Sequence, residues 1–293
     1  MSFKKYPSYN DFDLNNLKEI QEKNKLIPSK LYKYTRAHNA KDLLYYNTLY
    51  LPEIHELNDP YEGELLYNNE ILKNAYFKNK KEEFDKEIIG DINDFPKEQH
   101  KRIYELRERM LNKESDQYIE SLKKFIHEGI YFICLSSSNK INSLWAHYAN
   151  NHDGICIEYD IKNCNEPFFK NSCFKVEYVE TSDDTSDIKD FINKNEIDFN
   201  LVLKPFLKKS IEWEYEKEWR IILEKENIKR ELHFEPYKPY IKFLKPSKVY
   251  LGLNISRKNE ETIKTICQIK KIPLSKATKT NESYDFKFEE IKL

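Results

Sequence analysis

The stretch that decides the fold is SLWAHYANNHDGICIEYD, residues 143–160. It follows residues 129–136, an apolar run with the length and composition of a buried central strand. Within the stretch, the apolar positions of residues 144–149 have helical spacing, Gly154 marks a turn, and residues 155–159 have the composition of another strand. The stretch therefore predicts a strand–helix–strand corner at the centre of a sheet.

The segments on either side of this corner predict an α+β fold with a mixed, largely antiparallel sheet flanked by helices. Strands are predicted at residues 31–35, 48–52, 173–179, 219–223, 232–234, 241–244, 248–251 and 284–288, and helices at 37–46, 188–211 and 257–269. Residues 68–127 are highly charged, with helical spacing near 71–76, 103–110 and 119–126, and predict a helical insertion. We expect a single domain over 1–293, with a polar lead-in over 1–27.

Composition limits the classes of function. The 49 basic and 50 acidic side chains leave a net charge of −1, which argues against a global basic field for nucleic-acid binding but not against a local patch. The 5 cysteines form no CxxC pair, so neither a disulfide framework nor a zinc knuckle is predicted. No apolar run reaches the length of about 18 residues that a membrane helix needs. We expect a cytoplasmic protein with no membrane partner and no metal.

Three motifs hold most of the candidate functional side chains: NDPYE (58–62), the stretch 143–158, and WEYEKEWR (213–220). The candidate catalytic residues are Glu62, His147 and Glu218. The candidate cofactor-binding residues are Tyr34, Thr35, Asn58, Asp59, Trp145, Tyr148 and Arg220. There is no P-loop, Rossmann glycine pattern or GxSxG elbow, so ordinary NTPase, dehydrogenase and serine-hydrolase chemistry is not predicted.

On these three motifs, in this order, the chain resembles a bacterial family catalogued as domain of unknown function 2971. The resemblance spans roughly residues 31–251, and the helices of 68–127 lie outside it. It implies an accessory protein or a defence or toxin-type effector, and it implies no mechanism.

The order of elements is also similar to that of the ADP-ribosyltransferase superfamily, with an LYKYT strand at 31–35, aromatic residues in the middle and a late acid, Glu218. This resemblance implies that Tyr34 and Thr35 contact NAD and that Trp145 or Tyr148 stacks on a ring. It also implies that His147 or Arg220 meets phosphate and that Glu218 is catalytic. We therefore expect an enzyme that uses NAD or another nucleotide for ADP-ribosyl or glycosyl transfer to a macromolecular acceptor, or for NAD hydrolysis.

Two other functions remain open. One is a non-catalytic module that binds protein or nucleic acid. The other is a metal-dependent nuclease with Asp59, Glu62 and Glu218 around magnesium; a helical zinc pair is not predicted, because His147 and His152 are five residues apart.

Structural roles compete with these functional ones. For Trp145 and Trp219 a place in the core is favoured over a stacking platform, His147 is suited to a buried hydrogen bond, and Arg220 can pair with Glu218, Glu216 or Glu62. His152 is expected to be exposed in its turn. Convergence of the polar residues on an open pocket favours an enzyme, whereas burial with mutual pairing favours a structural role.

Overall fold

The computed structural model describes residues 27–62, 95–180, 206–228, 232–235, 238–280 and 285–293, together with positions 69–70, 72–74, 76–77 and 80. The chain divides into two compact units. Of the described residues, the first unit contains those within Glu53–Ile130 and Val179–Ser210, and the second contains 27–52 and those within Tyr131–Tyr178 and Ile211–Leu293. The predicted lead-in before Ile27 and the predicted helix between 188 and 205 lie outside the described residues.

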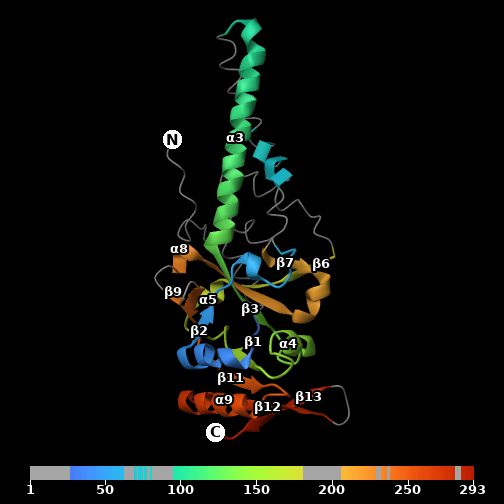
Figure 1. Cartoon of the computed structure of the whole chain (residues 1–293), viewed down its shortest axis with the longest axis vertical. Helices are drawn as coiled ribbons and strands as arrows, with labels where there is room; N and C mark the ends of the chain where they lie inside the picture. The colour runs from blue at the N-terminus through green and yellow to red at the C-terminus, as the bar shows by residue number, and fades with distance from the viewer. Residues whose placement is uncertain are drawn as a thin grey trace. The chain divides into compact units, whose positions relative to one another are not determined.

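The second unit is built on an eight-stranded sheet with the order β13-β12-β11-β4-β1-β3-β8-β5 (Figure 1). Its strands are β1 (Leu31–Thr35), β3 (Ile130–Ser136), β4 (Ile155–Tyr159), β5 (Cys173–Lys175), β8 (Glu218–Glu224), β11 (Lys248–Leu251), β12 (Leu274–Lys279) and β13 (Phe286–Ile291). The pairs β1–β3, β1–β4, β4–β11, β5–β8 and β12–β13 are antiparallel, and β11 and β12 run parallel. The predicted α+β class with a mixed, largely antiparallel sheet is confirmed.

Shorter elements surround this sheet. A three-stranded sheet, in the order β2-β10-β9, consists of β2 (Thr48–Tyr50), β9 (Leu232–Glu235) and β10 (Lys238–Lys242). The second unit also contains η2 (Ala37–Asn39), η3 (Lys41–Tyr46), α4 (Asn142–His147), α5 (Pro167–Asn171), η6 (Ile211–Glu216), α8 (Lys225–Ile228) and α9 (Arg257–Lys270). The remaining elements are η4 (Ile54–Glu56), α3 (Lys97–Gly129), β6 (Glu177–Val179) and β7 (Lys208–Ser210).

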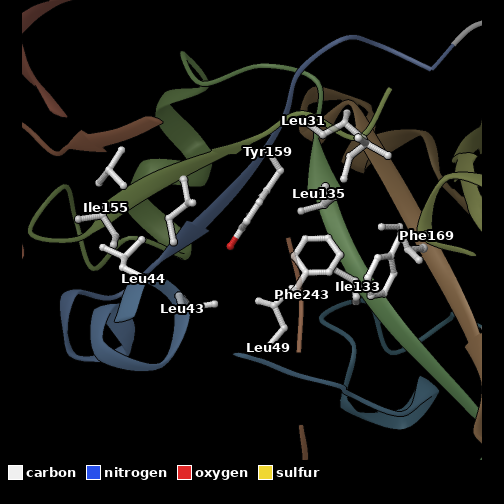
Figure 2. Packing of buried hydrophobic residues seen from close by; sticks show 14 of the residues in the cluster. Leu31, Leu43, Leu44, Leu49, Ile133, Leu135, Ile155, Tyr159, Phe169 and Phe243 are labelled. Carbon is white, nitrogen blue, oxygen red and sulfur yellow. The ribbon is translucent and has the colours of Figure 1, made fainter. Parts of the chain in front are cut away.

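The main core lies against one face of the eight-stranded sheet. Side chains alternate along each strand, so Leu31 enters the main core while Tyr32 and Tyr34 point to the opposite face. In Figure 2 the rings of Tyr159, Phe169 and Phe243 lie among aliphatic side chains of this core. The centroid of the Phe243 ring lies 4.9 Å from that of Tyr159 and 4.8 Å from that of Phe169. Aromatic contacts therefore fill much of the interior.

The helices differ from the prediction in two places. The helical spacing predicts separate helices at 103–110 and 119–126, but both ranges belong to α3, a single helix of 33 residues. No proline and no internal glycine interrupts α3 before Gly129, so nothing in its sequence ends the first helix. The segment predicted as one helix over 37–46 forms the 3-10 turn η2 and the π-helix η3, which ends at Asn47 in a left-handed conformation with φ 56°.

The strands differ at the edges of the sheet. The strand predicted over 173–179 is divided into β5 and β6, and β9 and β10 form a separate sheet. Residues 208–210, predicted as helix, form β7. The strand β12, which lies between β11 and the edge strand β13, was not predicted, because its sequence LSKATK has few of the apolar residues on which strand prediction depends.

Candidate functional site

The predicted corner is present, and its turn is unusually strained. After α4, the non-glycine residues Asn150, Asn151 and His152 all have positive φ, at 49°, 52° and 66°. Left-handed conformations of this kind are costly for residues with a side chain and persist where the surrounding structure holds them. The turn directs the His152 ring onto Trp145, with ring planes 7° apart and centroids at 5.6 Å. His152 is therefore half-buried and stacked, where the sequence predicted exposure.

Two of the predicted cofactor-binding residues hold this corner together. Trp145 is fully buried, and its indole nitrogen donates to the carbonyl of Asn139 at 2.9 Å. The Tyr34 hydroxyl donates to the carbonyl of Ser138 at 2.8 Å and accepts from the amide of Ile141 at 3.2 Å. Both side chains thus fix the loop that leads into α4.

A cluster of polar side chains lies where the second and third motifs meet. Tyr148 follows α4, and its hydroxyl donates to Oε1 of Glu216 at 2.8 Å. Four residues after Glu216, Arg220 makes a bidentate pair with Glu218: Nε donates to Oε1 at 2.8 Å and Nη2 donates to Oε2 at 2.9 Å. We call Tyr148, Glu216, Glu218 and Arg220 the carboxylate cluster.

Backbone contacts place the carboxylate cluster on the sheet. The carbonyl of Glu216 accepts from the Ser136 hydroxyl at 2.7 Å, and the carbonyl of Lys217 accepts from the amide of Ser137 at 3.0 Å. Lys217, between the two glutamates, has a positive φ of 49°. This left-handed residue lies between the end of η6 and the start of β8. Strained backbone of this kind is enriched at functional sites.

Burial and negative charge dominate the electrostatics of the cluster. Burial raises the pKa of the Tyr148 hydroxyl, and the carboxylates of Glu216 and Glu218 raise it further. Tyr148 is therefore a protonated hydrogen-bond donor across the physiological pH range. Glu216, Glu218 and Arg220 are all buried, with Arg220 only 1% exposed.

The other predicted residues of the second unit lie apart from these hydrogen bonds. His147 is exposed at the end of α4, where its ring lies edge-on to Tyr148 at 6.5 Å. The Thr35 hydroxyl accepts from Nδ2 of Asn39 at 2.9 Å, which ties β1 to η2. Roles for His147 and Thr35 in binding or catalysis stay predictions.

The residues of the first motif belong to the first unit and are organised around a buried lysine. Nζ of Lys209 lies 3.1 Å from Oε1 of Glu62 and 3.1 Å from Oδ1 of Asn58. The Lys209 and Glu62 side chains are 0% and 1% exposed. Asp59 accepts from the amide of Tyr61 at 3.0 Å, which closes an Asx turn.

A second polar network surrounds Glu158. Glu158 lies in the stretch 143–160, but the sequence did not predict its polar partners. Glu158 accepts from the Tyr250 hydroxyl at 2.6 Å and the Ser247 hydroxyl at 2.9 Å, and Nζ of Lys30 lies 3.1 Å away. Burial raises the pKa of Glu158, but these hydrogen bonds and the charge of Lys30 outweigh it, so the pKa is lowered from its usual 4.5. An acid among apolar strand residues was the available signal.

We expect Tyr250→Phe to cost about 1–2 kcal/mol of unfolding free energy at pH 7, because it removes a hydrogen bond to a buried carboxylate. Since the folded pKa of Glu158 is lowered, its stabilising contribution is present above the unfolded pKa of about 4.3 and is lost as the pH falls through the folded value. The difference in unfolding free energy between wild type and Tyr250→Phe should therefore become smaller at acid pH. Denaturant titrations at pH 7 and at acid pH measure this difference.

Tyr32→Phe is the matched control, because Tyr32 of β1 lies opposite Glu158 of β4 and its hydroxyl makes no hydrogen bond among the described residues. It should leave stability within about 0.5 kcal/mol of wild type. A loss in Tyr250→Phe that does not change with pH would contradict the role given to Glu158.

A pocket of about 810 Å³ opens elsewhere in the second unit. It is lined by Asp160, Asn163, Cys164, Asn165, Glu166, Phe168, Phe169, Ile228, Ile241, Lys242, Phe243, Leu244 and Lys245. None of the residues predicted to be functional lines it. Within the described part of the chain, no three His, Cys, Asp or Glu side chains are placed to hold a metal ion, and no helix is long and apolar enough to cross a bilayer.

Comparison with protein families gives a match to part of the chain. The model of a family described as "Protein of unknown function (DUF2971)" matches residues 144–221. This segment runs from α4 through most of β8 and contains all four residues of the carboxylate cluster. Comparisons with curated proteins and with solved structures found no match.

Proposed function

We propose that the carboxylate cluster, which lies within the segment 144–221 that matches the family model, is the reaction centre of an enzyme that uses NAD or a related nucleotide. The observation that carries the proposal is the meeting of two motifs about 70 residues apart, which brings the half-buried Tyr148 together with the buried side chains of Glu216, Glu218 and Arg220. A carboxylate next to a developing oxocarbenium ion stabilises its positive charge. The burial and mutual pairing of Glu218 and Arg220 favour a structural role for these two residues, so a test of the enzyme must separate loss of activity from loss of stability.

The proposed reaction breaks the bond between C1′ of the ribose and the nicotinamide nitrogen. Nicotinamide leaves with the electron pair of that bond, and the ribose becomes oxocarbenium-like. A nucleophile on a macromolecular acceptor, or water, attacks C1′ and loses a proton. Arg220 fixes the Glu218 carboxylate in one orientation, so this carboxylate stabilises the cation without reorganisation, while Tyr148 orients Glu216.

Incubation of the full chain with NAD, with and without protein and nucleic-acid acceptors, tests this proposal by measuring released nicotinamide. Glu218→Gln keeps the shape of the side chain and removes its charge. We expect it to lower the rate of release about 100-fold or more, the effect of losing one electrostatic contact to a transition state. Absence of nicotinamide release with every acceptor would count against the proposal.

Glu158→Gln is the matched control, because Glu158 is also a buried, hydrogen-bonded glutamate of the same sheet. Both variants should be compared at equal folded fraction, measured by thermal unfolding. If both lose activity in proportion to lost folding, the effect of Glu218→Gln is structural.

A second candidate function is a non-catalytic binding module. The closed Glu218–Arg220 pair favours it, since each charged group already has a partner of opposite charge. In that case partners captured from a lysate remain bound to Glu218→Gln, and neither protein releases nicotinamide.

A further inference from the structure

Two exposed tyrosines and several lysines form a distinct surface in the second unit, away from the carboxylate cluster. We call it the tyrosine–lysine patch and define it by Lys41, Tyr45 and Tyr46 of η3 and by Ile269, Lys270 and Lys271 at the end of α9. η3 packs against α9, and in Figure 1 the blue helical turns of η3 lie beside the red helix α9. Tyr45 and Tyr46 are 40% and 49% exposed.

The rings and the ammonium groups of the patch are in direct contact. Nζ of Lys270 lies 4.6 Å from the centre of the Tyr45 ring, and Nζ of Lys41 lies 5.5 Å from the centre of the Tyr46 ring. The two rings are perpendicular, at 89°, with centroids 5.1 Å apart. One face of each ring is thus next to a positive charge.

The charge of the patch is positive even though the whole chain is nearly neutral. Residues 41–46 and 264–271 contain four lysines and one acid, Asp42. The acids of α9 lie at its other end, where Glu261 pairs with Arg257 at 2.9 Å and Glu260 pairs with Lys276 at 2.6 Å. A polyanion therefore meets little local repulsion at the patch.

We propose that the tyrosine–lysine patch binds single-stranded nucleic acid, with bases stacked on Tyr45 and Tyr46 and phosphates next to the lysines. Aromatic platforms in a basic groove are the means by which proteins bind single strands without sequence preference. Perpendicular rings accept bases that are splayed apart, which a flexible single strand supplies and a stacked duplex does not.

An anionic membrane fits this surface less well. Binding in a membrane interface requires an apolar helix face that is free to enter the lipid. The apolar stripe of α9, consisting of Ile263, Ile266 and Cys267, is buried in the protein core. The inference does not depend on the proposed enzymatic activity.

Fluorescence anisotropy of the full chain with a labelled oligothymidine of about 12 nucleotides tests the proposal. We expect binding that weakens about 10- to 20-fold between 50 and 200 mM salt, as for contact with about three phosphates. A hairpin duplex of the same charge should bind at least tenfold more weakly. The double variant Tyr45→Ala/Tyr46→Ala should lose at least tenfold in affinity, whereas Tyr45→Phe/Tyr46→Phe should retain it.

The controls are Tyr104→Ala, which removes another exposed tyrosine, and Lys258→Ala, which removes an exposed lysine at the other end of α9. Neither should change affinity. Equal binding of duplex and single strand, or no loss of affinity in the double alanine variant, would overturn the proposal. So would binding to phosphatidylserine vesicles that depends on Tyr45 and Tyr46 without binding to the oligonucleotide.

Discussion

Arg220→Met is expected to destabilise the second unit by about 3–5 kcal/mol. Methionine fills much of the volume of the arginine, so the change chiefly leaves the Glu218 carboxylate buried without its bidentate partner. Breaking a buried ion pair from one side costs about this amount, because the remaining charge is desolvated and uncompensated. All 3 tryptophans, Trp145, Trp213 and Trp219, lie in the second unit, so tryptophan fluorescence in a urea titration measures its unfolding.

A double-mutant cycle separates the ion pair from simple packing. Glu218→Gln combined with Arg220→Met removes both charges and should recover a large part of the loss, since neutral groups of similar shape replace a buried pair at low cost. If Arg220→Met alone costs less than about 1 kcal/mol, the pair does not support the sheet in the way described. The same cycle shows how much of any lost activity in Glu218→Gln is due to lost stability.

The centre of the fold was predictable because its signals are local. The run 129–136 and the alternation of LYKYT at 31–35 gave β3 and β1 almost to the residue. The strand β12 was less predictable, because it contains polar residues and is defined by its pairing with β11 and β13. The length of α3 depends on the absence of helix-breaking residues, which a search for apolar periodicity does not detect.

The candidate site was predictable as a set of residues but not as contacts. Tyr148, Glu218 and Arg220 were all identified, yet their arrangement depends on a hydrogen bond to Glu216 and on the left-handed residue Lys217. A sequence pattern does not show which acid a tyrosine or an arginine will meet. For Glu218 and Arg220 the structure shows the mutual pairing that the sequence left as one of two alternatives.

Trp145→Ala is expected to cost about 3–5 kcal/mol, the range for removing a large aromatic side chain from a core. Trp145 lies at the centre of the second hydrophobic cluster, where it contacts Tyr34, Phe286 and Phe288 by their rings and stacks on His152. Trp213 and Trp219 remain as fluorescent reporters in this variant. Trp145→Phe keeps a ring and loses the hydrogen bond to Asn139, so it should cost about 1–2 kcal/mol.

This prediction decides between the two roles considered for Trp145. A platform for a nucleotide base leaves stability nearly unchanged when truncated and lowers affinity, whereas a core anchor does the reverse. Burial lowers the pKa of His152, so His152 favours the folded state above the unfolded pKa of about 6.5 and loses that contribution as the pH falls. Trp145→Ala exposes the imidazole and should flatten this part of the stability–pH curve. If the curve is unchanged and the protein keeps its stability, Trp145 is not the anchor of the corner.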